Sequence, residues 1–232
     1  MEIIPVLDLK NSVAVSGKSG NRDTYSPLKT IYASSSDPVE IAISLKRAGA
    51  KEMYIADLNF IERDGSHNIY KIKEANMILP VIVDVGVDNL RTFEFMLDYA
   101  YKIIVATETL ESVDELRKIF EKYPKERIII SVDVKNNELL SKNMDMDLKT
   151  FKDVLREIDP NEIILLDISS VGTEAGFNRE LFNQFAEFSD KIILGGGITK
   201  DEIDEISSLG IKKALVGTAL HKGEISLNQI GL

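Results

Sequence analysis

The sequence KIILGGG at positions 191–197 joins an apolar run directly to three consecutive glycines. An apolar run without polar alternation is typical of a parallel strand that is buried on both faces. The glycines after it allow a tight turn in which backbone N–H groups can approach a ligand. The stretch therefore indicates a buried parallel strand whose end carries a binding loop.

Seven further runs of the same kind are spread along the chain, with segments of helical periodicity between them. They are IIPVLDL (3–9), EMYIADL (52–58), PVIVDVG (80–86), KIIVATE (102–108), RIIISVDV (127–134), EIILLDI (162–168) and KKALVGT (212–218). Repeated strand–helix units predict an α/β fold with a parallel sheet. Eight such units favour closure into a (β/α)8 TIM barrel, formed by residues 1–232 as a single domain. An open doubly wound sheet is the structural alternative.

Composition and charge exclude several classes of function. The 232 residues are 44% hydrophobic and 28% charged, which is the profile of a soluble globular protein. A net charge of −10 argues against binding to nucleic acid or to an anionic membrane surface. The absence of cysteine excludes disulfides, thiolate catalysis and zinc–thiolate sites.

The remaining features of the sequence predict a cytoplasmic protein that acts on a small molecule. The N-terminal MEIIPVLDLK has no basic region of a signal peptide, and no apolar run is long enough to span a membrane. Only two histidines are present, so a histidine-rich metal site is not expected. We expect no metal, no cofactor, and a monomer or small homo-oligomer.

The two halves of the chain resemble each other, which indicates two fused half-barrels. Matched positions lie 110 or 111 residues apart: Asp57 with Asp167, Asn68 with Asn178, Gly86 with Gly197, and Ala106 with Gly217. A near-constant offset through three strand ends is difficult to obtain by chance. Asp8 and Asp133 also occupy equivalent places, at the ends of the first and fifth strands.

The strongest candidate for a binding site lies after the seventh and eighth strands. Gly196 and Gly197 follow the seventh strand, and Gly217 and Thr218 follow the eighth. Paired glycine loops at these strands form the phosphate site that is typical of the TIM barrel. The sequence therefore predicts a phosphorylated small-molecule substrate, bound by these four residues.

Three further groups of residues are candidates for the same site. Asp8 and Asp133 face each other across the predicted barrel, and two such carboxyl groups can act as general acid and general base. In DISSVGTEAGFN (167–178), the residues Asp167, Thr173 and Gly176 are candidates for substrate contact. The loop SGKSGNRDTYSP (16–27) brings Lys18 and Arg22, which we interpret as cations of a lid. The loop 16–27 is equally compatible with an ordinary solvated loop, whereas an ordinary loop is the less favoured alternative for 167–178.

Taken together, the motifs IPVLDLKNS (4–12), DISSVGTEAGFN, LGGGI and LVGTAL resemble the HisA/HisF group of histidine biosynthesis, over nearly the whole chain. HisA is the ProFAR isomerase, which performs an Amadori rearrangement of a phosphoribosylamine, and HisF is a cyclase subunit with a glutaminase partner. The resemblance implies that Asp8 is the general base, that Asp133 is the strand-five aspartate, and that Thr173 belongs to the strand-six loop.

Two departures from the group's usual pattern stand out. The group usually has an aspartate as second catalytic acid in the strand-six loop, where this chain has Val171, and valine cannot transfer a proton. The first phosphate site usually has glycines and a cation, where this chain has Asp84, Asp88 and Glu108. Clustered carboxylates repel a phosphate.

These departures predict a divergent HisA-like enzyme that acts on a phosphorylated sugar or heterocycle with one phosphate, by isomerase or lyase chemistry. Three alternatives remain open at this point. They are a genuine ProFAR isomerase, a non-catalytic barrel that binds a phosphorylated metabolite or regulates a partner, and a synthase subunit like HisF.

Overall fold

Eight parallel strands close into a barrel in the computed structural model, which describes residues 1–16 and 25–227. They are β1 (Glu2–Lys10), β4 (Met53–Asp57), β5 (Val81–Asp84), β6 (Lys102–Ala106), β7 (Ile128–Lys135), β9 (Ile163–Asp167), β10 (Ile192–Gly195) and β11 (Lys213–Val216). Neighbours follow chain order, and β11 pairs with β1 to close the ring. Each strand lies within one of the eight apolar runs or extends it by one residue, so the predicted TIM barrel is confirmed and the open sheet is excluded.

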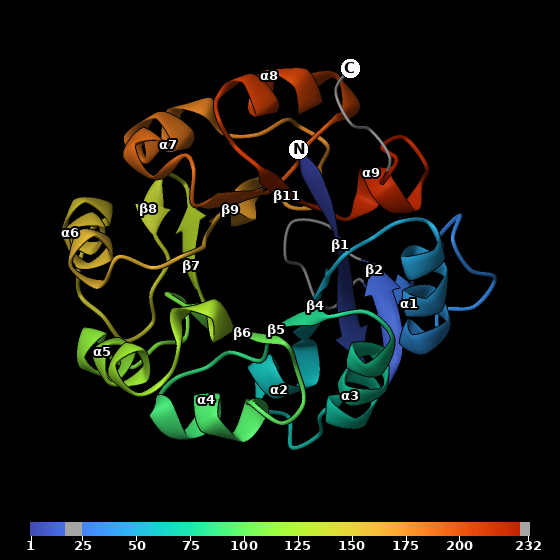
Figure 1. Ribbon diagram of the computed structural model, residues 1–232, viewed down its shortest axis with the longest axis horizontal. Helices are drawn as coiled ribbons and strands as arrows, with labels where there is room; N and C mark the ends of the chain where they lie inside the picture. Colours follow the sequence, from blue (N-terminus) through green and yellow to red (C-terminus); the bar gives the residue numbers. More distant parts are fainter. Residues whose placement is uncertain (17–24, 228–232) are drawn as a thin grey trace.

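Helices surround the strands on the outside of the barrel (Figure 1). They are α1 (Pro38–Arg47), α2 (Leu58–Glu62), α3 (Ile69–Ile78), α4 (Leu90–Met96), α5 (Val113–Lys122), α6 (Leu148–Ile158), α7 (Arg179–Gln184), α8 (Ile203–Ser208) and α9 (Thr218–His221). Several begin at side-chain caps that satisfy free backbone N–H groups. The Asp37 carboxylate, for example, accepts the N–H of Val39 at 2.8 Å at the start of α1. No helix of the described residues is both long and apolar enough to cross a membrane.

Side chains of each strand alternate between two separate cores. In β1, Ile4 and Val6 belong to the inner core, which fills the barrel, whereas Ile3 and Leu7 belong to the outer core, between the sheet and the helices. This alternation follows from the two-residue period of a strand. It places Asp8, two residues after Val6, on the inner face at the upper end of the barrel.

Short antiparallel strands raise the wall of the barrel mouth and were not expected from the sequence. β2 (Val13–Ser16) folds back on β1, and β3 (Ser26–Pro27) pairs with β2. β8 (Glu138–Leu139) folds back on β7 in the same way. Each is too short to give a periodic signal of its own, and each depends on the strand beside it for its hydrogen bonds.

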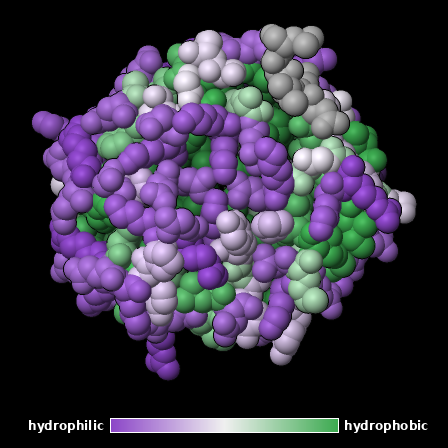
Figure 2. All heavy atoms as spheres, in the orientation of Figure 1, coloured by the Kyte–Doolittle hydropathy of each residue, from purple (hydrophilic) through white to green (hydrophobic). Residues whose placement is uncertain are grey.

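A closed ring of four alternating charges fills the opposite end of the barrel, where the strands begin. The Lys102 ammonium contacts Glu52 at 3.3 Å and Glu162 at 2.6 Å, and the Lys213 ammonium contacts the same two carboxylates at 2.5 and 2.7 Å. The four residues come from every second strand of the barrel. Hydrophilic side chains also occupy the centre of the face seen in Figure 2.

The ring follows the internal repeat of the sequence. Glu162 lies 110 positions after Glu52, and Lys213 lies 111 positions after Lys102. Burial opposes the charge of Lys213, but hydrogen bonds with Glu162 and Glu52 outweigh it and hold the pKa of Lys213 above its usual value. The two halves of the chain therefore meet in one interaction to which each contributes a glutamate and a lysine.

A second repeated contact joins the end of the second strand of each half to the loop that follows this strand. Asn68 donates its side-chain amide to the Asp57 carboxylate at 2.6 Å, and Asn178 donates in the same way to Asp167 at 2.9 Å. Each aspartate also caps the helix or turn that follows its strand. The matched Asp–Asn pairs of the sequence are thus the same structural feature in both halves.

Replacing Lys102 by methionine should destabilise the protein by about 3–5 kcal/mol, because it leaves two nearly buried carboxylates to share one lysine. Lys118→Met is the matched control, since Lys118 is half exposed and pairs with Glu115 on the surface. Its cost should stay below about 1 kcal/mol. Urea unfolding measures both. Equal losses would mean that the ring contributes no more than a surface ion pair.

Candidate active site

A cavity of about 910 Å³ opens at the carboxyl ends of the barrel strands. Five carboxyl side chains line it, from Asp8, Asp84, Glu108, Asp133 and Glu174. The glycine loops after β10 and β11 line it as well, through Gly196, Gly197, Gly217 and Thr218. The barrel thus brings residues that are up to 210 positions apart in the chain around one space, as its parallel strands require.

Asp133 is the deeply buried carboxyl group of the cavity, with 4% of the residue exposed. Burial raises its pKa to about 8, with the charges of Asp84 and Glu108 adding to the effect. The hydroxyl of Ser131, which donates to Oδ1 at 2.7 Å, and the N–H of Glu108 oppose the rise. At neutral pH, Asp133 therefore holds a proton.

Asp8 lies across the barrel from Asp133, because β1 and β7 are four strands apart in the ring of eight. In register it stands beside Ala56 of β4, and Ala56 stands beside Asp84 of β5. The small alanine leaves space between the two carboxyl groups. The predicted pairing of Asp8 and Asp133 on facing walls of one cavity therefore agrees with the strand order.

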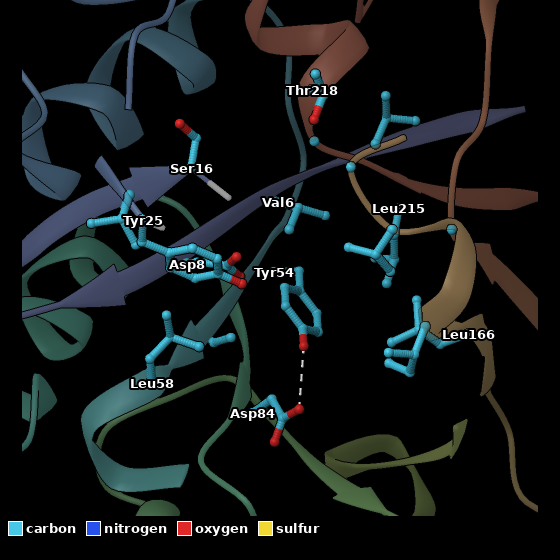
Figure 3. A pocket seen from close by; sticks show the side chains of 18 of the residues that line it. Val6, Asp8, Ser16, Tyr25, Tyr54, Leu58, Asp84, Leu166, Leu215 and Thr218 are labelled. Carbon is cyan, nitrogen blue, oxygen red and sulfur yellow. Dashed lines mark hydrogen bonds between the residues drawn. The ribbon is translucent and has the colours of Figure 1, made fainter. Parts of the chain in front are cut away.

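Tyr54 stands on the floor of the cavity and was missed by the sequence analysis. It is the only tyrosine within the described barrel strands, it is 8% exposed, and its hydroxyl donates to Asp84 Oδ2 at 3.2 Å (Figure 3). Burial raises the pKa of Tyr54 well above its usual value, and the charges of Asp84, Asp8 and Asp133 add to this. A polar aromatic residue at an inward position of a buried strand was the available signal.

The loop after β10 has a backbone that only glycine accommodates. Gly196 and Gly197 have φ values of +103° and +68°. A Cβ on Gly197 would lie 2.9 Å from the carbonyl oxygens of both Gly176 and Ser170. The loop therefore packs backbone against backbone, and its shape is fixed by the loop that follows β9.

The loop after β9 lines the cavity through residues other than the three that the sequence singled out. Ile168, Val171, Gly172 and Glu174 line it, whereas Asp167, Thr173 and Gly176 are absent from its wall. The Asp167 carboxylate accepts from Ser169, Ser170 and Asn178, and the exposed Thr173 hydroxyl donates to the Ser170 carbonyl at 2.8 Å. Gly176 donates its N–H to the Gly197 carbonyl at 3.0 Å. These three candidates thus shape the loop beside the glycines.

The equivalent site in the first half has a different chemistry. Gly86 keeps a φ of +65°, but Ile61 and Thr109 stand against it. Asp84 and Glu108 line the cavity there, and Glu108 pairs with Lys142 at 2.9 Å. Asp88 lies outside the lining and binds Thr92 and Arg63 instead. No cluster that could hold a metal ion is present among the described residues.

Three lysines at the rim complement the carboxyl groups. Lys29, Lys135 and Lys222 line the cavity, and Lys222 pairs with Glu174 at 2.5 Å. The two cations expected from the sequence, Lys18 and Arg22, lie outside the described residues. The positive charge that an anionic ligand would meet at the described rim therefore comes from residues that sequence reasoning did not single out.

Comparison with known proteins adds to this geometry. Residues 2–226 match the family described as "Histidine biosynthesis protein". An uncharacterized protein of Methanocaldococcus jannaschii is 41% identical over 99% of this chain and 97% of its own length. Relatives from Lactococcus lactis subsp. cremoris and Brachyspira hyodysenteriae are 31% and 30% identical, over 99% of this chain and 95% and 98% of their own lengths. Both are named as isomerases of an imidazole-4-carboxamide with a phosphoribosyl and a phosphoribosylamino group.

Asp133→Asn should become steadily more stable relative to the unchanged protein as the pH rises from about 4 to about 8. In the folded protein Asp133 keeps its proton up to about pH 8, whereas in the unfolded chain it ionises near pH 4. Between these values the unfolded state is favoured by ionisation, and asparagine removes that effect. Urea unfolding of both proteins at pH 5, 7 and 9 measures it. A difference that stays constant over this range would contradict a raised pKa.

Proposed function

Since the chain belongs to the histidine biosynthesis protein family, we propose that it is a HisA-like enzyme that isomerises a sugar or heterocycle carrying a single phosphate. The phosphate binds to the loops after β10 and β11. The reacting part of the substrate lies between Asp8 and Asp133.

The difference between the two half-barrels carries this proposal. The second half offers Gly196, Gly197 and Gly217 to a ligand, with backbone N–H groups of the kind that bind phosphate. At the equivalent places the first half has Val85, Gly86 and Ala106, and the neighbouring Asp84 and Glu108 add carboxyl groups to the cavity wall. A phosphate next to charged carboxylates would be repelled strongly in a space that excludes water. A substrate with two phosphates fits this cavity poorly.

The facing carboxyl groups support isomerase chemistry. An Amadori-type isomerisation moves protons within the substrate and neither adds nor removes atoms, so one group must give a proton and another must take one. Asp133, buried and protonated at neutral pH, suits the role of acid. Asp8, on the opposite wall, suits the role of base. Val171, in the loop after β9, takes no part in proton transfer. Asp133 acts as the acid in place of a residue from the loop after β9.

Genuine ProFAR isomerase activity is the second candidate, because the relatives named as such isomerases cover nearly the whole chain. Growth of a bacterium that lacks this isomerase, on medium without histidine, tests it. We expect no growth when this protein is supplied. Growth that is lost on Asp8→Asn would establish the second candidate and remove the single-phosphate proposal.

Gly197→Ala should weaken the binding of inorganic phosphate by about tenfold or more, equivalent to about 1.4 kcal/mol. Alanine is strained at a φ of +68°, and its Cβ would force apart the two loops that form the cradle. Gly86→Ala is the matched control, because Gly86 has nearly the same φ, +65°, in the first half. Isothermal titration calorimetry measures both affinities.

The control variant should bind phosphate as the unchanged protein does, with one site per chain. Two sites in the unchanged protein, or equal weakening by both substitutions, would contradict a single site after β10 and β11. A crystal grown in phosphate provides the direct view. One anion at Gly197 and Gly217 is expected there, with none at Gly86 and Ala106.

A further inference from the structure

The hydroxyl group of Tyr54 has a fixed partner inside the cavity. In the sheet, Tyr54 pairs with Val6 of β1 and with Ile82 of β5. It lies two residues before Ala56, which pairs with Asp84. From there the ring reaches upward, and its hydroxyl donates to Asp84 Oδ2 at 3.2 Å. The other oxygen of Asp84 accepts the N–H of Gly86 at 2.9 Å. Two donors therefore fix the orientation of the Asp84 carboxylate, and Figure 3 shows the first of them, the Tyr54 hydroxyl.

This arrangement exists in only one half of the barrel. The position 110 residues after Tyr54 is Ile164, and the position 111 residues after Asp84 is Gly195. The second half therefore has a hydrocarbon side chain and an open backbone where the first half has a phenol and a carboxylate. Because the inner core contains the buried side chain of Ile164 at the equivalent position, the barrel itself does not require a hydroxyl at this level.

The charge of Asp84 acts on Asp133 across the cavity. Hydrogen bonds to a carboxylate favour its charged form, and Asp84 accepts two, from the Tyr54 hydroxyl and the Gly86 N–H. Tyr54 cannot share that charge, because burial and the surrounding carboxylates raise its pKa and keep it protonated. After burial, the charge of Asp84 is the largest of the causes that raise the pKa of Asp133. The other ionisable groups that line the cavity with Asp133 are Asp8, Tyr25, Lys29, Tyr54, Asp84, Glu108, Lys135, Glu174, His221 and Lys222.

We propose that Tyr54 is a positioning residue of this site, which holds the Asp84 carboxylate in place so that its charge helps burial to keep the proton on Asp133. The assignment of Asp133 as acid and Asp8 as base rests on the proposed function. The protonation of Asp133 does not, since burial is its main cause and the charges of Asp84 and Glu108 add to it. In the proposed reaction, Asp133 gives this proton to the substrate and Asp8 takes one from it, and exchange with solvent restores both groups.

We call the effect of Tyr54 on Asp133 through Asp84 the relay. Carbon-13 NMR titration of the aspartate carboxyl groups tests it without any substrate. Tyr54→Phe should lower the titration midpoint of Asp133 by about one pH unit, since Asp84 loses the donor that favours its charge. Asp84→Asn, which removes the charge and keeps the shape, should lower it at least as far. On the Asp84→Asn background, Tyr54→Phe should have no further effect. Tyr70→Phe, on the exposed face of α3, is the matched control and should leave the midpoint unchanged.

Each other result overturns the relay. An unchanged midpoint in Asp84→Asn would remove Asp84 as the link, and this arm holds even if Tyr54→Phe fails to fold. An equal effect of Tyr54→Phe with and without Asp84 would mean that Tyr54 acts on Asp133 directly. A relay that holds in a protein without isomerase activity would remove the proposed function and leave the inference standing, so the two failures are distinguishable.

Discussion

The pairing of β11 with β1 is the contact on which the rest of the molecule depends. It converts a row of eight parallel strands into a ring, and in a ring every carboxyl end faces the same mouth. Closure also gives each strand two faces with separate tasks, one for the inner core and one for the layer under the helices. The cavity, its facing carboxyl groups and the ring of four charges at the other end all follow from that closure.

The two ends of the barrel show how one repeated backbone is used in two ways. At the end where the strands begin, the halves contribute identical residues, and Glu52, Lys102, Glu162 and Lys213 neutralise one another. At the mouth the halves differ. Glycine loops face the ligand space from one half, and Tyr54, Asp84 and Glu108 face it from the other. Symmetry is kept where it stabilises the fold and abandoned where a ligand would bind.

Burial of Asp133 illustrates the conflict between stability and chemistry. A carboxyl group with a pKa near 8 is held in a place that penalises its charge, so the folded state loses stability as the pH rises toward that value. The same penalty provides a proton donor at neutral pH. The electrostatic strain lies with the side chains that face the cavity, whereas the opposite end of the barrel is neutralised internally.

The sequence by itself determined the barrel and the location of its mouth. Continuous apolar runs give strands their identity locally, and glycines such as Gly197 mark a loop by a backbone conformation that other residues avoid. It could not determine which polar residues face each other. Asp167 resembles Asp133 in the sequence, yet its carboxylate is occupied by its own loop. Tyr54 resembles a core residue, yet its hydroxyl reaches Asp84, 30 positions away. Only the tertiary structure decided these contacts, because the strand register and the tilt of the closed barrel determine which side chains meet, and neither is encoded in any short stretch of chain.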